Sequence, residues 1–196
     1  EQYKLALFTA VICTKYFAME EKQNPYVQNI QNLPDTLAVF PLNGVLLLPG
    51  GQLPLNIFEP RYLEMVNDAL AGKRMIGIIQ PNLTLPQGHN GTASLHKIGC
   101  AGKITEFNET IDGRYLITLT GISRFEVVEE NDVSTPYRQV HAGWNNFAED
   151  LKSKTCLGLD RDHLHMLLKS YFAKEDLECD WLAIEKTSDN KLITCL

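Results

Sequence analysis

The order of the sequence patterns predicts an α+β fold in which strands come first and helices last. Up to about residue 142, short apolar or alternating runs are separated by turns rich in proline and glycine, which is typical of strands. After Asp160, apolar residues recur three and four positions apart, which is the period of a helix. The chain has 196 residues, 44% apolar and 21% charged, so it can bury a sizeable core. We expect an extension at 1–36, a β domain at 37–150 and a helical subdomain at 151–196.

The first elements of the β domain are two extended segments and a helix. A strand at 37–40 ends at Pro41, because proline cannot donate to a ladder. An apolar run at 45–48 stops at the turn Pro49-Gly50-Gly51, and 53–58 is extended again. A helix begins at Glu59-Pro60, because proline suits the first helical position, and Gly72 fits its C-terminal cap. The buried stripe of this helix comprises Tyr62, Val66, Ala69 and Leu70, widened by Leu63.

The remaining elements of the β domain follow a strand period. A buried strand at 75–79 is closed by Pro81, and 82–95 is a loop rich in Asn, Gly, Thr and Pro. Asp112-Gly113 signals a two-residue hairpin between the strand at 98–104 and the alternating strand that begins at Tyr115. Gly121 interrupts that strand as a bulge. Strands then resume at 125–128 and 138–142, and the residues expected on one face of the strand at 98–104 are Ile98, Cys100 and Ile104.

Helices are expected over the last part of the chain. Asp160 is a suitable N-cap for a helix with a wide apolar face, formed by Leu164, Leu167, Leu168, Tyr171 and Phe172. A second short helix covers 177–184, and Ser188 could cap a third that runs to Leu196. Because the last five residues are strongly apolar, we expect the helical subdomain to be truncated and the natural protein to continue.

Two segments carry a resemblance to a known family. The first is FPL followed by LLPGGQLPLNIFEPRY at 40–62, and the second is IGCAGKI at 98–104 followed by GISRF at 121–125. Together they resemble the N-terminal, substrate-binding domain of Lon proteases, and most of all the small standalone bacterial Lon-domain proteins. The resemblance covers about 37–196. It implies a PUA-like β-barrel of about six strands with one inserted helix, followed by a helical C-terminal subdomain.

The resemblance also implies a function, which is recognition of unfolded or degron-bearing polypeptides. No GxxxxGK[ST] phosphate loop occurs, and the serine–lysine peptidase region of the full protease is missing. We therefore expect no enzymatic activity, no catalytic residues and no cofactor. The expected partners are unfolded or specific protein substrates and a separate ATPase or protease, for which the chain would be an adaptor. The alternative is a PUA-like module that binds RNA or nucleotides.

Charge, cysteines and histidines narrow the function classes further. A net charge of -6 disfavours nucleic acid, although a basic patch near Lys97, Lys103 and Arg114 would favour it. Five cysteines without a CxxC motif indicate reduced thiols, so we expect a cytoplasmic protein. The apolar run at 5–13 is too short to span a membrane. The spacing of His163 and His165 places them on different helix faces, so no metal site is expected.

The candidate polypeptide-binding residues fall in two segments. Glu59, Arg61 and Tyr62 could form a polar anchor at a binding groove; the structural alternative is a local ion pair at the start of the helix. Gln52, in the turn at 49–52, is expected to contact a partner together with the 82–95 loop. Leu83 and Leu85 lie in the 82–95 loop, where exposed apolar side chains could hold an unfolded chain. The structural alternative for this loop is a simple connection. We expect affinity to come from apolar contact, with strand addition at an open barrel edge as a second contribution.

Overall fold

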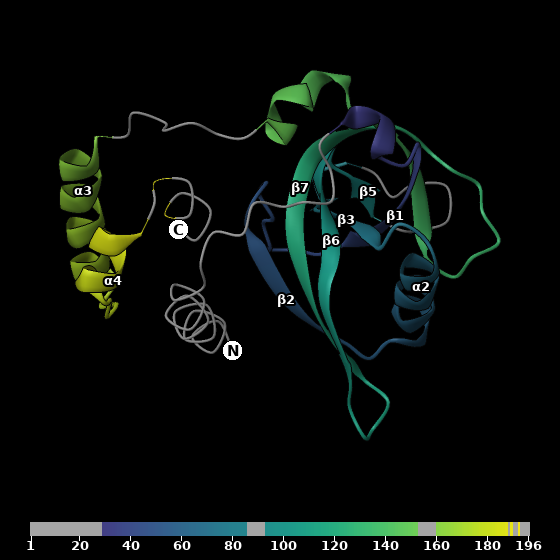
Figure 1. Ribbon diagram of the computed structural model, residues 1–196, viewed down its shortest axis with the longest axis horizontal. Helices are drawn as coiled ribbons and strands as arrows, with labels where there is room; N and C mark the ends of the chain where they lie inside the picture. The colour runs from purple at the N-terminus through teal and green to yellow at the C-terminus, as the bar shows by residue number, and fades with distance from the viewer. Residues whose placement is uncertain (1–28, 86–92, 153–159, 188, 190–191, 193–196) are drawn as a thin grey trace. The chain divides into compact units, whose positions relative to one another are not determined.

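The computed structural model describes residues 29–85, 93–152 and 160–187, together with 189 and 192 (Figure 1). These residues form two compact units, one ending at Lys152 and one beginning at Asp160. The apolar run at 5–13, most of the third expected helix and three of the five cysteines, which are Cys13, Cys156 and Cys195, lie outside the described residues. No described helix is long and apolar enough to cross a membrane.

Six strands form one sheet whose ladder closes on itself. The strands are β1 (Thr36–Pro41), β2 (Gln52–Ile57), β3 (Met75–Ile79), β6 (Ile98–Glu109), β7 (Tyr115–Glu130) and β8 (Arg138–Gly143). Their order is β2-β7-β6-β3-β1-β8, and β8 also pairs with β7. The five strands β7, β6, β3, β1 and β8 therefore form a closed ring, and β2 pairs with β7 outside that ring. Only the β1–β3 pairing in this sheet is parallel. The predicted α+β class with six strands is confirmed.

The 82–95 segment is more ordered at its ends than the predicted loop. Pro81–Asn82 (β4) pairs with Ser94–Leu95 (β5) in a separate two-stranded sheet. The prediction of an unstructured connection from residue 82 to residue 95 is therefore wrong at both ends. The Asn82 side chain also accepts a hydrogen bond from the Thr84 amide at 3.1 Å, which shapes the turn after β4. Residues 86–92 lie outside the described part of the chain.

The helix α2 (Pro60–Ala71) follows β2 and precedes β3, as the inserted helix was predicted to do. Pro60 occupies the first turn, and the Gly72 amide caps the end by donating to Asp68 and Ala69 oxygens at 3.1 Å. Tyr62, Met65 and Val66 are its buried residues. The predicted stripe missed Met65, because the centre of the buried face lies nearer the start of the helix and leaves Ala69 and Leu70 half-buried.

The buried apolar residues form two clusters, and the same strand can contribute residues to both. On β3, Ile76 and Ile78 belong to the cluster that packs under α2, whereas Met75 and Ile79 belong to the second cluster. Phe125 is fully buried in this second cluster. An added Cβ at Gly99 would lie 2.6 Å from its Cζ atom and one at Gly77 would lie 2.9 Å from it. These two glycines therefore make room for the ring. The predicted shared face of β6 is wrong at Ile98, which is exposed, while Cys100 and Ile104 are buried.

Glycine also sets the hairpin and the bulge of β7. The Thr110 amide donates to the Arg114 oxygen at 2.9 Å, so the loop between β6 and β7 has three residues rather than the predicted two. Gly113 takes the left-handed position in it, with φ of 78°, which is typical of three-residue hairpins. At Gly121 the register shifts, as predicted. An added Cβ there would lie 2.1 Å from the Leu48 oxygen, so glycine allows the turn at 49–51 to reach the strand.

The second unit contains α3 (Arg161–Lys174) and α4 (Trp181–Lys186). Asp160 caps α3 by accepting from the His163 amide at 3.0 Å, as predicted, and Asp180 caps α4 in the same way. No residue of α3 is fully buried among the described residues. Of the apolar face predicted for it, Leu164, Leu168 and Phe172 are half-buried, and Leu167 and Tyr171 are exposed. The β unit also contains two 3₁₀ helices, η1 (Ile30–Asn32) and η2 (Asn145–Leu151). They carry no periodic signal in the sequence and were not predicted.

Candidate functional site

Glu59, Arg61 and Tyr62 lie together at the junction between β2 and α2. Glu59 Oε2 accepts from Arg61 Nε at 3.0 Å and from Nη2 at 2.8 Å. The Arg61 guanidinium also lies 4.5 Å from the centre of the Tyr62 ring. Tyr62 is buried against Phe40, with ring centroids 4.2 Å apart, and burial raises the pKa of its hydroxyl. The local ion pair that was the structural alternative is therefore present, and only the Glu59 and Arg61 side chains face solvent.

Gln52 lies apart from this group, at the start of the outer strand. It pairs in register with Thr120 on β7 and is exposed. The Gly121 amide donates to the Gly51 oxygen at 2.8 Å, so alternation places the backbone groups of Gln52, Pro54 and Asn56 on the side of β2 away from β7. No described strand pairs with that side of β2. Pro54 has no N–H there, which is how edge strands commonly limit pairing with other chains.

Leu83 and Leu85 are the exposed apolar members of the predicted site residues. They lie in the turn after β4 and are 71% and 53% exposed. Among the described residues, the side-chain hydrogen bonds of this turn stay within it, between Asn82 and Thr84, and those of the Glu59 carboxylate go to Arg61. The predicted residues therefore occupy separate places, namely the β2 edge, the start of α2 and the turn after β4.

A second exposed apolar group lies at the far end of the β6–β7 hairpin, which projects from the rest of the β unit in Figure 1. Its members are Phe107, Ile111 and Leu116, with Phe107 and Leu116 on opposite faces of the hairpin because Phe107 is the register partner of Ile117. The Phe107 ring packs edge-on against Tyr115, with centroids 5.0 Å apart. Sequence reasoning missed this group, although the apolar Ile111 beside the turn signal Asp112-Gly113 was an available sign.

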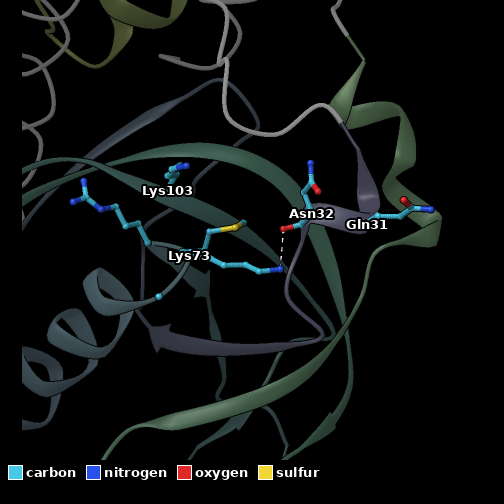
Figure 2. Close-up of a pocket in the computed structure, with 7 residues that line it drawn as sticks. Gln31, Asn32, Lys73 and Lys103 are labelled. Carbon is cyan, nitrogen blue, oxygen red and sulfur yellow. Dashed lines mark hydrogen bonds between the residues drawn. The ribbon is translucent and has the colours of Figure 1, made fainter.

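Positive charge gathers at one pocket, which sequence reasoning also missed. Gln31, Asn32, Gly72, Lys73, Arg74, Met75 and Lys103 line an open pocket of about 350 Å³; we call it the cationic pocket (Figure 2). The patch considered from sequence does not form, because Lys97 directly precedes β6, Lys103 lies within it and Arg114 lies at the turn end of the β6–β7 hairpin, which places them about 20 Å from one to the next. The adjacent Lys73 and Arg74 after the helix end were the available signal.

The arginine of the GISRF segment has a structural role. The Arg124 guanidinium donates to both carboxylate oxygens of Asp150, Nε to Oδ2 at 2.9 Å and Nη2 to Oδ1 at 2.8 Å. The Arg124 backbone amide donates to the same Oδ2 at 3.0 Å. The hydrogen bonds to Asp150 raise the pKa of Arg124. These contacts fix η2 on β7. Because the Arg124 guanidinium and the Asp150 carboxylate bond to each other, we assign the pair a structural role.

The other titratable groups do not assemble a reactive site in the described part of the chain. Cys100 is buried in the core under α2, and burial raises the pKa of the Cys179 thiol. Tyr137 donates to Asp68 Oδ2 at 2.6 Å, and burial together with this bond raises its pKa to about 12. Within the described ranges, no group of three or more His, Cys, Asp or Glu residues could hold a metal ion.

Comparison with known proteins adds to this geometry. The family model of the ATP-dependent protease La (LON) substrate-binding domain matches residues 36–188. A Lon protease of Flavobacterium johnsoniae is 30% identical over 101 residues, which are 52% of this chain and 12% of the relative. A Lon protease of Anaeromyxobacter dehalogenans is 25% identical over 105 residues, which are 54% of this chain and again 12% of the relative. The match thus spans about an eighth of the length of these relatives.

A solved structure matches the fold as well. The crystal structure of a Lon N-terminal domain protein from Xanthomonas campestris superposes with a TM-score of 0.51 and 25% sequence identity. The superposition covers 70% of this chain and 73% of that one. This similarity supports the fold described above.

Proposed function

Because the chain belongs to the family of ATP-dependent protease La (LON) substrate-binding domains, we propose that it is a non-catalytic recognition domain that binds unfolded or degron-bearing polypeptides. The observation that carries this proposal is the exposure of large apolar side chains on short turns. Leu83 and Leu85 are the first candidates, because an unfolded chain presents apolar groups that a folded protein buries. Covering the exposed parts of both side chains would contribute about 2–3 kcal/mol.

The polar candidates complement this apolar contact. Glu59 and Arg61 remain solvent-facing at the start of α2; the Arg61 guanidinium could donate to a bound backbone, and the Glu59 carboxylate could accept from it. The free side of β2 at Gln52 could add a strand on either side of Pro54. Since Pro54 interrupts the row of donors on that side, strand addition would be short. Apolar contact therefore supplies the larger share of affinity in this proposal.

A partner that acts on the captured chain completes the proposal. In this proposal, a separate ATPase or protease supplies the energy-dependent unfolding. The recognition domain would then serve as an adaptor that raises the local concentration of substrate near that enzyme. Co-purification of a nucleotide-dependent ATPase with the tagged chain, increased by added unfolded protein, is the outcome expected of an adaptor.

The direct test is a fluorescence-anisotropy titration of the whole chain against a labelled, permanently unfolded protein. Its folded form and a short single-stranded RNA serve as competitors. The paired variant Leu83→Ser with Leu85→Ser should weaken binding about tenfold or more, because part of the buried apolar area is lost. Leu182→Ser, at a leucine of similar exposure on α4, is the matched control. Displacement by RNA, or equal affinity of the paired variant and wild type, would contradict the proposal.

A further inference from the structure

The cationic pocket brings three positive side chains together in a protein of net charge -6. Lys73 and Arg74 follow the end of α2, and Lys103 comes from β6. Among the described residues that line the pocket there is no carboxylate and no aromatic ring. Gln31 and Asn32 of η1 complete the lining; in Figure 2 the Asn32 oxygen faces Lys73, whereas the Gln31 side chain points away from it. The lining is therefore rich in donors that favour a compact anion.

Lys73 is held in place by the backbone of the neighbouring segment. Its Nζ donates to the Asn32 oxygen at 3.0 Å, drawn as the dashed line in Figure 2, and to the Leu33 oxygen at 3.4 Å. A lysine ammonium has three donors, so the third can serve a ligand. Because the side chain is already anchored, a ligand would not have to bear the full entropy cost of ordering it.

Arg74 starts from a fixed and unusual backbone position. Its φ is 60°, in the left-handed region that a bulky residue rarely occupies. Its amide donates to the Ala69 oxygen at 2.8 Å, and its oxygen accepts from the Ile104 amide at 2.8 Å. Glycine would fit this helix end more easily, yet the chain carries a guanidinium there. No described carboxylate lies within ion-pair distance of Arg74.

Strand pairing brings Lys103 to the same place. Met75 on β3 is the register partner of Lys103 on β6, so Lys103 is one residue position away from Arg74 across the ladder. Burial lowers the pKa of Lys103, and the charge of Arg74 lowers it further. A bound anion would relieve this repulsion between like charges.

We propose that the cationic pocket receives a carboxylate group of the bound polypeptide, from an acidic side chain or from the C-terminus. This inference rests on the proposed function and specifies one chemical feature of its substrates. A carboxylate matches the fork of an arginine and the point charge of a lysine. Nucleic acid fits less well, because the overall negative charge repels a long polyanion and the pocket offers no ring on which a base could stack.

Matched peptides and matched variants test this inference. One labelled, unstructured peptide carries glutamates and a free C-terminus, a second has its glutamates replaced by glutamine, and a third is amidated at the C-terminus. Arg74→Gly removes a charge at a position whose backbone suits glycine, and Lys103→Gln removes a second charge without that change of backbone. Lys97→Gln removes the same charge at an exposed site outside the pocket and serves as the control.

The expected result is a three- to tenfold weaker binding of the peptide that lacks the recognised carboxylate, a range estimated as about 0.7–1.4 kcal/mol. The glutamine and amidated peptides tell which carboxylate is recognised. Arg74→Gly and Lys103→Gln should each reduce this preference, whereas Lys97→Gln should keep it. Equal binding of all three peptides, or an unchanged preference in both pocket variants, would overturn the inference and leave the proposed function standing. Failure of every peptide to bind would refute both, and RNA binding that Arg74→Gly abolishes would assign the pocket to phosphate instead.

Discussion

Asp150 is the residue whose replacement most sharply tests how η2 is attached to the β unit. Its side chain is 5% exposed and accepts three hydrogen bonds from Arg124, whose side chain is 46% exposed. Asp150→Asn removes the negative charge and turns an amide N–H₂ toward at least one arginine donor. The arginine fork therefore keeps one amide oxygen as an acceptor and loses the other.

The magnitude follows from the exposure of the two partners. Exposed ion pairs contribute about 0–1 kcal/mol, and breaking a buried pair costs about 3–5 kcal/mol. With one partner buried and the other half-exposed, Asp150→Asn should lower the free energy of unfolding by about 2–3 kcal/mol. Glu149→Gln is the matched control, because the ion pair of Glu149 with Lys152 is largely exposed. We expect its effect to stay below about 0.5 kcal/mol.

Urea unfolding followed by tryptophan fluorescence measures this effect. The chain has two tryptophans, Trp144 and Trp181, so a Trp181→Phe background leaves Trp144 as the reporter. Trp144 is buried against Phe125, with centroids 5.9 Å apart, directly before η2. A cycle with Arg124→Gln isolates the pairwise energy. A loss for Asp150→Asn no larger than that of Glu149→Gln, or a coupling energy near zero, would refute the reasoning.

Three further predictions concern stability and can be checked by urea unfolding of the same background. Tyr137→Phe removes the bond to Asp68 and should cost about 1–2 kcal/mol of unfolding free energy. Since the folded-state pKa of Tyr137 is raised from 10.0 to about 12, this contribution is complete below pH 10 and is lost as the pH rises to about 12. A difference in unfolding free energy between wild type and variant that stays constant across this pH window would contradict the prediction. Gly99→Val should cost more than about 2 kcal/mol, because its Cβ would meet Phe125 and the Ile78 oxygen at 2.6 and 2.7 Å. Gly143→Ala should cost far less, because its Cβ would lie 3.2 Å from Val128 Cγ2 and 3.7 Å or more from Glu126. Arg74→Gly should leave stability unchanged or raise it by up to about 1 kcal/mol, because the backbone there is left-handed; a clear loss would show that the arginine side chain is structural.

Local signals in the sequence identified the elements that such signals determine. Pro60 and Gly72 bounded α2 correctly, Asp160 capped α3, and Gly121 marked the bulge. Each of these depends on a backbone requirement of one residue type, and such a requirement can be read without knowing the rest of the fold.

Long-range features could not be read in this way. The closure of β8 on β7 and the parallel pairing of β1 with β3 join segments that are distant in sequence, and no local pattern specifies them. The same holds for the cationic pocket, because Lys103 reaches Arg74 only through the β3–β6 register. Among the predicted site residues, the local pair of Glu59 and Arg61 could be considered from sequence because they are two positions apart. The position of Leu83 relative to this pair depends on the whole fold and could not be predicted.

The central claim is that the chain recognises unfolded polypeptide through apolar contact. Isothermal titration calorimetry at several temperatures, with one protein in its permanently unfolded and its folded form, tests this most directly. The account predicts saturable binding of the unfolded form alone, with a negative heat-capacity change that the paired variant Leu83→Ser with Leu85→Ser makes smaller. Equal binding of the folded form, or a heat-capacity change near zero, would contradict it.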